Sequence, residues 1–364
     1  MLISEKSKEI MDNCRFCWMC RHICPIGNVT GQERNTARAR MLALSLVERG
    51  AEPLSGVADN IYECALCGAC TKECVTGFDP VKTVKEVRTE LAMNGETPDY
   101  IEKLINNVME YGNVYGEKEI PKKLAEKIKE LPEKADVLLF LGKDAIYKTP
   151  DKAIDAIELL KKAGLNFTVL AQEPDSGYAM DFLVGKTAET KGIMEKCAQQ
   201  LDFKTVVAYD GADAKIFLRE YKEWGINLKT EVKTFTSYIA QLIADGKLNP
   251  KKSDTTYTFQ DSSLIARDLD ETALAREIIS ACGGNLEMLL HGKDTMSAGN
   301  LIMNEYMPKV MREVAEARWI NAKNMNATVL VTASPAEYYM LSSVKPADIE
   351  LKTIEEVVLD ACRN

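Results

Sequence analysis

The sequence predicts an α-helical N-terminal domain followed by two tandem α/β domains with mainly parallel sheets. Two observations support this. Eight of the eleven cysteines stand in the first fifth of the 364-residue chain, among segments with helical periodicity. From Val137 onward, short apolar runs alternate with amphipathic helices, and this order occurs twice. We therefore assign residues 1–115 to the helical domain, 116–136 to a charged linker, and 137–250 and 251–364 to the two α/β domains.

The cysteines of the N-terminal domain form two runs with one spacing, C-x2-C-x2-C-x3-C. This spacing is typical of [4Fe–4S] clusters, and in two-cluster proteins the fourth cysteine of each run ligates the other cluster. We therefore predict two [4Fe–4S] clusters. The ligands of the first are predicted to be Cys14, Cys17, Cys20 and Cys74. Those of the second are predicted to be Cys64, Cys67, Cys70 and Cys24.

Other uses of the cysteines fit the spacing less well. A disulfide framework is typical of short secreted chains, and the start MLISEKSKEI carries charges where a signal peptide would be apolar. A zinc site would take its four ligands from two C-x2-C pairs. Zinc and redox-active thiols remain the alternatives to iron–sulfur clusters.

Helix signals justify the elements of the N-terminal domain. Residues 36–49 read as a helix stopped by Gly50. A second helix begins at Asp79 and Pro80, as N-cap and first residue, and ends at Gly95. The segment between the cysteine runs has a helical pattern and no strand alternation, which favours a helical ferredoxin type. The linker contains the charged amphipathic helix EKEIPKKLAEKIKELPEK.

The α/β region contains an internal repeat. The interval from the first strand to the second is 29 residues in both halves, Leu138 to Phe167 and Tyr257 to Leu286. Helices are expected at Asp151–Ala163 and Glu271–Cys282. The expected strands are Val137–Leu141, Phe167–Leu170, Thr205–Ala208, Thr256–Phe259, Leu286–Leu290 and Thr328–Val331. Two βαβ units of this kind predict a pseudo-twofold pair of domains with a shared cleft.

The chain resembles the cysteine-rich (CCG-domain) iron–sulfur subunits of heterodisulfide reductases, glycolate oxidase, lactate-utilisation complexes and anaerobic glycerol-3-phosphate dehydrogenase. The resemblance rests on the cysteine runs, the segment ERNTARARMLALSLVERG, the stretch from Thr258 to Arg267 and the stretch from Val331 to Glu337. It implies a two-cluster ferredoxin domain followed by two tandem CCG-like domains. It also implies a flavin-containing dehydrogenase or oxidase as the partner, with the flavin on that partner.

The cysteines that define the family's C-terminal domains are missing here. Glu173-Pro-Asp175-Ser176-Gly177 and Asp210-Gly-Ala-Asp213 replace two cysteine motifs, and Ser297, Ser334 and Glu337 stand in the second domain. The remaining Cys197, Cys282 and Cys362 fall on predicted helices and are expected to be small buried side chains. Asp175, Asp210, Asp213 and Glu337 could form a hard-cation site or polar pocket, although loss of function explains them more simply.

The composition of the chain argues against several classes of partner and of chemistry. The net charge of −9 argues against nucleic acid or an anionic membrane as partner, and no apolar stretch reaches the length of a bilayer span. Two histidines leave little of the usual acid–base chemistry. We expect a cytoplasmic protein in a reducing setting, which reaches a membrane only through a partner.

Three hypotheses follow. The leading one is an electron-transfer subunit that relays electrons through the two clusters between the flavoprotein and a downstream acceptor, with other electron-transfer subunits as further partners. The alternative is an oxidoreductase with its own active site in the CCG-like cleft, although the sequence shows no nucleophile–base pair or cofactor fingerprint there. The third is a structural or sensory subunit, for which a single cluster would suffice.

Overall fold

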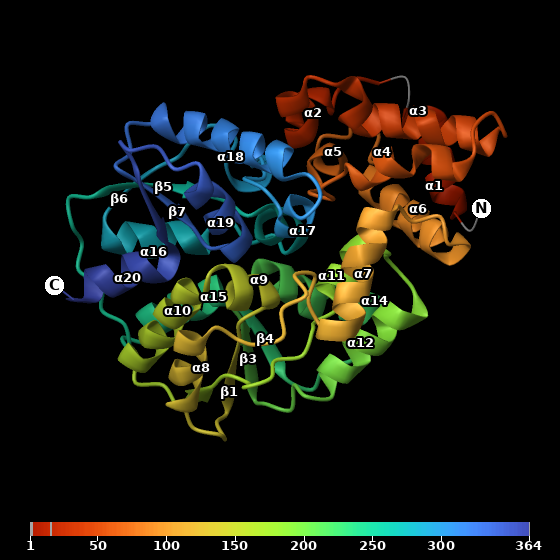
Figure 1. Cartoon of the computed structure of the whole chain (residues 1–364). Helices are drawn as coiled ribbons and strands as arrows, with labels where there is room; N and C mark the ends of the chain where they lie inside the picture. Colours follow the sequence, from red (N-terminus) through yellow and green to blue (C-terminus); the bar gives the residue numbers. More distant parts are fainter. Residues whose placement is uncertain (1–2, 15–16, 364) are drawn as a thin grey trace.

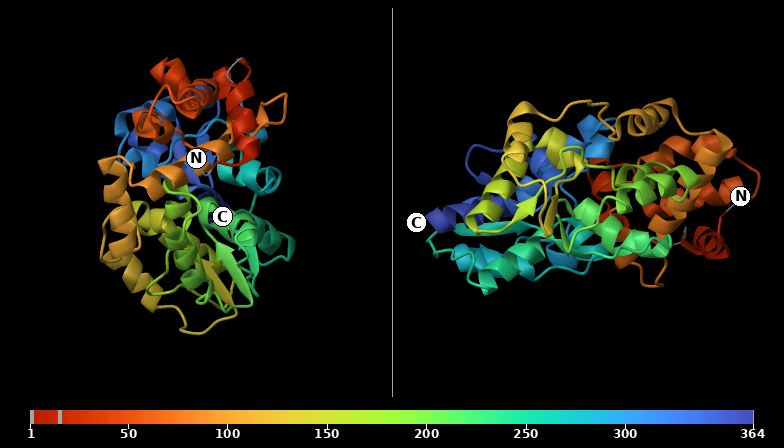
Figure 2. Two further views of the ribbon diagram at one scale, coloured as in Figure 1. Left: turned by 90° about the vertical axis from the view of Figure 1, so that its right-hand side faces the viewer. Right: turned by 90° about the horizontal axis from the view of Figure 1, so that it is seen from below.

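The computed structural model describes residues 3–14 and 17–363. Figure 1 shows the helical N-terminal domain packed beside both α/β domains, which lie one above the other. Its first helix and the last helix of the chain lie at opposite ends of the molecule, as Figures 1 and 2 show together. Among the described residues, no helix is long and apolar enough to cross a membrane.

The N-terminal domain is helical, as the sequence predicts. The Thr36 hydroxyl accepts from the Ala39 N–H and caps α3, while the Asp79 carboxylate accepts from the Lys82 N–H and caps α6. Gly95 ends α6 in the left-handed conformation, with φ 67°. The helices are α1 (Glu5–Asn13), α2 (Pro25–Thr30), α3 (Ala37–Glu48), α4 (Ala58–Tyr62), α5 (Ala69–Lys72), α6 (Pro80–Asn94) and α7 (Asp99–Tyr111).

The first α/β domain is built on a four-stranded parallel sheet of order β2-β1-β3-β4. Its strands are β1 (Val137–Phe140), β2 (Phe167–Thr168), β3 (Thr205–Ala208) and β4 (Glu231–Thr234). Its helices are α9 (Lys143–Lys148), α10 (Pro150–Lys162), α11 (Tyr178–Leu183), α12 (Ala188–Ala198), α13 (Gly211–Lys215), α14 (Tyr221–Glu223) and α15 (Phe235–Ala244), with a π-helical turn at Ile216–Glu220. The linker helix α8 (Lys122–Lys129) buries Leu124 and Ile128 in the same hydrophobic core as α10.

The second α/β domain repeats the topology, with sheet order β6-β5-β7-β8, again all parallel. The strands are β5 (Thr256–Gln260), β6 (Gly284–Leu286), β7 (Val329–Thr332) and β8 (Glu350–Thr353). The helices are α16 (Leu274–Cys282), α17 (Leu301–Asn304), α18 (Pro308–Lys323), α19 (Pro335–Ser343) and α20 (Ile354–Arg363), with a π-helical turn at Leu264–Asp268. The repeat and the parallel pairing predicted from sequence are thus confirmed.

The predicted strand positions need two corrections. The strand expected at Leu286–Leu290 lies at Gly284–Leu286 instead, and Leu290, with φ 56°, adopts a left-handed conformation that cannot continue a strand. The edge strands β4 and β8 were not predicted. Their sequences EVKT and ELKT place charged residues at half of the positions, because an edge strand faces solvent more than a central one does.

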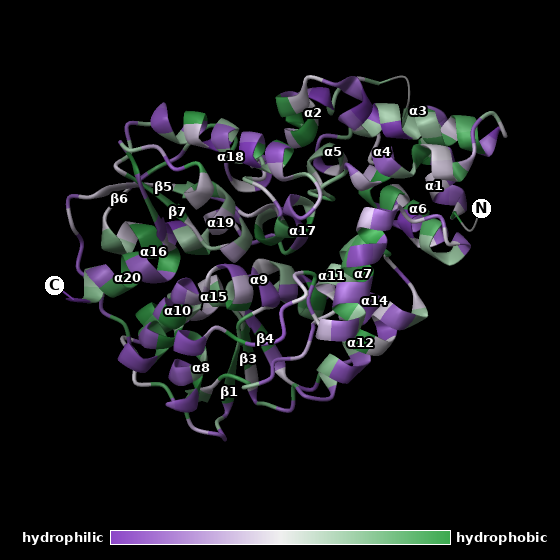
Figure 3. Cartoon of the chain, in the orientation of Figure 1, coloured by the Kyte–Doolittle hydropathy of each residue, from purple (hydrophilic) through white to green (hydrophobic). Residues whose placement is uncertain are grey.

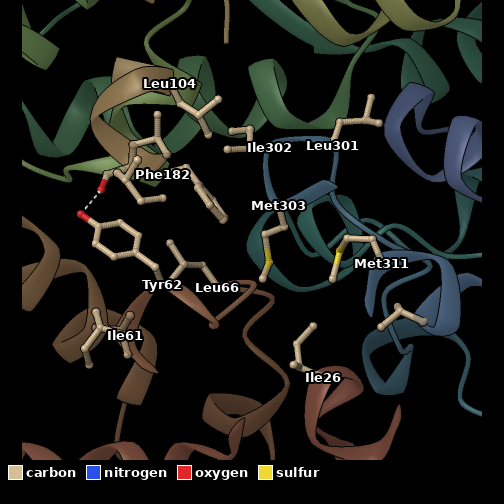
Figure 4. Packing of buried hydrophobic residues seen from close by; sticks show 14 of the residues in the cluster. Ile26, Ile61, Tyr62, Leu66, Leu104, Phe182, Leu301, Ile302, Met303 and Met311 are labelled. Carbon is tan, nitrogen blue, oxygen red and sulfur yellow. Dashed lines mark hydrogen bonds between the residues drawn. The ribbon is translucent and has the colours of Figure 1, made fainter. Parts of the chain in front are cut away.

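A single hydrophobic core joins the N-terminal domain to both α/β domains. Figure 4 shows Leu66 and Tyr62 packed near Phe182 of α11 and Met303 of α17, and the Tyr62 hydroxyl donates to the Leu183 carbonyl oxygen at 3.0 Å. Outer helices such as α10 and α12 alternate hydrophilic and hydrophobic residues along their length (Figure 3). The loop around the second cysteine run is therefore anchored where all three domains meet.

Candidate metal centres

The first predicted ligand set lies at the outer edge of the N-terminal domain. Cys14 follows α1, Cys17 is exposed, and Cys74 follows α5. The Cys74 sulfur receives the Phe78 N–H at 3.3 Å and lies 3.1 Å from the Thr76 hydroxyl. Burial of the Cys74 thiol opposes ionisation, but these hydrogen bonds outweigh it and lower the pKa of Cys74. A thiol that ionises readily is suited to ligating a metal.

Exposed apolar side chains surround the first set. Trp18 and Met19, between Cys17 and Cys20, are 49% and 50% exposed, and Val75, beside Cys74, is 73% exposed. The guanidinium of Arg38 lies 4.2 Å from the centre of the Trp18 ring. We call Trp18, Met19 and Val75 the apolar patch, and it places an accessible hydrophobic surface directly beside the first cysteine set.

The second predicted ligand set lines a cavity in the interior. Cys24, Cys64, Cys67 and Cys70 all line this space, whose remaining walls are mainly apolar. Cys24 caps α2, and its sulfur receives the Gly27 N–H at 3.4 Å. The loop that carries Cys67 turns through left-handed conformations at Leu66 and Gly68, with φ 50° and 74°. Burial of the Leu66 side chain in the three-domain core holds this unusual backbone in place.

Electrostatic effects show which thiols are neighbours. Burial, together with the nearby Cys20, Cys74 and Cys17, raises the pKa of Cys14 to about 12. Burial raises the pKa of Cys24 to about 11, and Cys67 and Cys64 add to this effect. Cys74 thus lies near the first run and Cys24 near the second. That is the arrangement that cross-ligation requires, although the ligand assignment itself stays a prediction.

The cavity lined by the second cysteine set also contains a buried positive charge. The Arg40 guanidinium lines it, is 2% exposed, and leaves its Nη2 without a hydrogen-bond partner. Its other nitrogens donate to the backbone carbonyls of Asn35 and Asn60. A buried cation is costly unless an anion lies close by, and an iron–sulfur cluster with four thiolate ligands is such an anion. The residues present therefore fit a [4Fe–4S] cluster.

A site for a single metal ion is a different arrangement. Within residues 3–14 and 17–363, no three His, Cys, Asp or Glu side chains converge on one ion-sized position. A [4Fe–4S] cluster needs no such convergence, because each of its four irons takes one cysteine. The same finding gives no support to a hard-cation site at Asp175, Asp210, Asp213 and Glu337.

Four of the polar residues that replace the C-terminal cysteines, Asp210, Ser297, Ser334 and Glu337, line a cleft between the two α/β domains. A space of about 430 Å³ is lined by Asp144 and Asp210 from the first domain, by Ser297, Ser334 and Glu337 from the second, and by Cys67. Asp175, Ser176 and Asp213 line a neighbouring space instead, together with Asp144 and Asp210. The cleft lies beyond the carboxyl ends of parallel strands, where ligands of open α/β sheets bind. Because Cys67 is one of its lining residues, the cleft reaches the second cysteine set.

Hydrogen bonds and burial shape the chemistry of this cleft. In the neighbouring space, the Ser176 hydroxyl donates to Asp213 Oδ1 at 2.5 Å. In the cleft, Glu337 accepts from the Ala298 N–H at 3.0 Å. Burial raises the pKa of Asp210 to about 8, with the neighbouring Asp144 adding to the shift. Burial likewise raises the pKa of Glu337 to about 7. These carboxyl groups therefore hold or release protons near neutral pH.

The three cysteines outside the runs line neither the cavity of the second cysteine set nor the cleft. Burial, together with the nearby Asp175, Asp213 and Glu173, raises the pKa of Cys197. Cys197 and Cys282 are fully buried, and Cys362 is partly buried. Burial raises the pKa of Cys282 to about 12, which keeps its thiol protonated. Cys197 and Cys282 are therefore small buried side chains, as predicted.

Known proteins resemble both the cysteine-containing segment and nearly the whole chain. Residues 10–78 match the family model described as "4Fe-4S dicluster domain". They contain both cysteine runs. We call this matched segment the dicluster domain.

Beyond the dicluster domain, similarity extends over nearly the whole chain. A subunit of dihydromethanophenazine:CoB–CoM heterodisulfide reductase from Methanosarcina acetivorans is 25% identical, covering 96% of this chain and 94% of that protein. EtfAB:quinone oxidoreductase from Syntrophomonas wolfei is 24% identical over 63% of this chain, which spans 34% of that protein. The chain fits an iron–sulfur subunit of the CCG type.

A solved structure shares the fold. A hypothetical protein from Helicobacter pylori aligns with a TM-score of 0.62 at 12% identity, over 100% of this chain and 73% of that one. This likeness shows that a helical N-terminal domain and two α/β domains of this kind occur together in another protein. It concerns the fold alone.

Sequence reasoning missed the arginines beside the second cysteine set. Arg88 of α6 donates to the Cys64 carbonyl oxygen, and Arg267 of the second α/β domain donates to that of Cys67, each at 2.7 Å. Arg40 and Arg88 sit on the inner faces of their helices, at positions where an apolar residue is usual. A charged residue at an inward-facing position of an amphipathic helix could have indicated these arginines from the sequence.

Proposed function

We propose that this chain is the electron-transfer subunit of an oxidoreductase complex. It relays electrons through two [4Fe–4S] clusters, from a flavin-dependent dehydrogenase or oxidase subunit to a downstream acceptor. The flavin belongs to the partner subunit, and the complex works in the cytoplasm, with membrane association through a partner. The clusters, when bound, supply one-electron chemistry, and the chain itself is not the catalytic subunit.

The observation that carries the proposal is the placement of the two cysteine sets. One has Cys17 exposed at the surface, and the other lines a space inside the N-terminal domain. Burial raises the pKa of Cys70 strongly, and Cys20 of the first run is among the thiols that add to it, so the two sets are neighbours. An outer site beside an inner one provides a path from the surface to the interior.

The ligands in this proposal are those that the spacing predicts. Cys14, Cys17, Cys20 and Cys74 hold the first cluster, and Cys64, Cys67, Cys70 and Cys24 hold the second. The apolar patch of Trp18, Met19 and Val75 is the surface on which the flavoprotein docks, because it brings a partner closest to the first cluster.

Metal analysis and cysteine variants test the proposal. Anaerobically purified protein should contain about eight irons and about eight sulfides, as two clusters require. Cys24→Ala should abolish the electron paramagnetic resonance (EPR) signal that Cys67→Ser abolishes, and spare the one that Cys17→Ser abolishes. The opposite pattern would refute cross-ligation, and a content near zero would refute the electron-transfer function.

The cleft supports a second candidate, an oxidoreductase with its own active site. Its basis is the space that Cys67 shares with Asp210 and Glu337, where protons and electrons could reach one bound molecule. The electron-transfer proposal expects no turnover of disulfides or hydroxy acids by the isolated chain. Turnover that Asp210→Ala removes, while the iron content stays the same, would favour the second candidate.

A further inference from the structure

Three arginines surround the second cysteine set from different parts of the fold. Arg40 comes from α3, Arg88 from α6, and Arg267 from the π-helical turn after β5. Arg40 and Arg88 are 2% and 0% exposed, and Arg267 is partly buried. The charge around this site is therefore assembled by tertiary folding.

Each of these guanidinium groups binds backbone carbonyl oxygens and no carboxylate among the described residues. Arg40 Nη1 donates to Asn35 at 2.5 Å, Arg88 Nη2 to Cys64 at 2.7 Å, and Arg267 Nε to Cys67 at 2.7 Å. Within the described part of the chain, one nitrogen of each group is buried without a hydrogen-bond partner, namely Arg40 Nη2, Arg88 Nε and Arg267 Nη2. Their positive charges are therefore not neutralised locally.

Two arginines lie over the patch residue Trp18, and neither is a buried, unneutralised charge. Arg38 is bound by Glu33, and Arg21 is exposed to solvent. The carboxylates next to the second run are occupied as well, since Glu63 binds Arg34 at 2.7 Å and Glu73 binds Lys72 at 2.9 Å. The three arginines beside the second cysteine set, by contrast, have no carboxylate partner among the described residues.

The buried guanidinium charges affect how readily the second site is reduced. Accepting an electron adds one negative charge to a site, and nearby positive charges stabilise the reduced form most where water does not screen them. Burial of the site acts in the opposite direction, because desolvation disfavours added charge. The guanidinium groups of Arg40, Arg88 and Arg267 act against that effect from the same buried region.

We propose that Arg40, Arg88 and Arg267 hold the second site at a more positive reduction potential than the first. This inference rests on the proposed function, in which both sites carry [4Fe–4S] clusters. Electrons that enter at the exposed first site then move energetically downhill to the buried second site. The second site, beside the interdomain cleft, is the exit side of the chain.

A redox titration of the full-length protein tests this, with each cluster followed by its EPR signal. Cys17→Ser and Cys67→Ser identify which signal belongs to which site. In the wild type, we expect the second-site signal to appear at the higher potential. Arg267→Gln should make the reduced second site about tenfold less favoured at a fixed potential, a shift of about 59 mV for one electron. The first-site signal should not move.

Two further variants separate tuning from folding. Arg40→Met should shift the second-site signal in the same direction, while Arg40→Lys, which keeps the charge, should restore most of the wild-type value. Arg38→Gln is the matched control, since Arg38 is already paired with Glu33, and it should leave the second site unchanged. Unshifted potentials with full iron content, or a wild-type order with the first site higher, would overturn the inference alone. Absence of both clusters would overturn the proposed function instead.

Discussion

The two cysteine runs have the same spacing but very different surroundings. The first predicted set sits at the edge of the dicluster domain, with Cys17 and the apolar patch in contact with solvent. The second faces an interior cavity, is flanked by three arginines, and opens toward the cleft between the α/β domains. Local sequence therefore specifies the same ligand type twice, while distant segments decide how each site is used.

The α/β domains contribute to the second site in two ways. Arg267 reaches from the second domain to the Cys67 loop, and the Leu183 carbonyl of the first domain accepts from Tyr62, two residues before Cys64. These bonds tie the second cysteine run to residues far away in sequence. We therefore expect disturbances at the second site to reach the whole molecule, and disturbances at the first to stay local.

The largest expected difference is in the loss of a ligand. Cys67→Ser and Cys17→Ser should each lower the iron content from about eight to about four per chain. Cys67→Ser should in addition destabilise the junction of the three domains by more than about 4 kcal/mol, the range associated with loss of a structural metal site. Anaerobic thermal unfolding measures this, and equal losses of stability in the two variants would contradict the comparison.

Removing the charge at Arg40 should have opposite effects on the loaded and the metal-free protein. With the cluster bound, Arg40→Met should cost about 3–5 kcal/mol, because the cluster loses its buried counter-charge. In the chelated protein the same change should be neutral or stabilising, because an unpaired buried cation is gone. Urea unfolding before and after chelation measures both. A matched change at the first site, Arg38→Met, should cost at most about 1 kcal/mol in either state.

The cleft should give the second-site region a pH dependence that the first-site region lacks. Burial raises the pKa of Asp210 from 3.8 to about 8 in the folded chain. As pH rises from about 4 to about 8, the unfolded chain loses this proton while the folded chain keeps it, so stability falls, by at most about 1.4 kcal/mol per pH unit. Asp210→Asn should flatten this slope in urea titrations. Asp99→Asn, on the exposed first turn of α7, should leave it unchanged.

The smallest expected effect concerns the backbone of the two cysteine loops. Gly68, beside Cys67, and Gly77, three residues after Cys74, have φ of 74° and 72°. An added Cβ at Gly68 would lie 3.6 Å from Arg267 Nε, an ordinary contact, and one at Gly77 would have no neighbour within 4 Å. Each Gly→Ala change should therefore cost about 1–2 kcal/mol, from the left-handed conformation alone. A much larger cost at Gly68 would show that the loops also differ in their backbones.

Sequence patterns with a local physical cause predicted the fold well. Thr36, Asp79 and Gly95 begin and end helices because their side chains or conformational freedom satisfy the backbone at those positions. The central strands β1, β3, β5 and β7 were predicted because they are short, mainly apolar or β-branched runs, and the repeated 29-residue interval indicated that the two sheets share one plan. The edge strands β4 and β8 escaped prediction because half-polar strands resemble loops. The left-handed backbone conformation of Leu290 also could not be predicted, because this residue lies within an apolar run that resembles a strand.

By itself, the sequence determined the chemistry that the cysteines can support, since their spacing depends on neighbours a few residues apart. It also determined the order of helices and strands. The tertiary structure alone decided that Cys17 of the first set is exposed and that the second set lines an internal space. It also placed Arg40, Arg88 and Arg267 around one set, and brought Asp210 and Glu337 to the same cleft. Burial and electric fields arise from residues that are distant along the chain and close in space, so no local pattern encodes them.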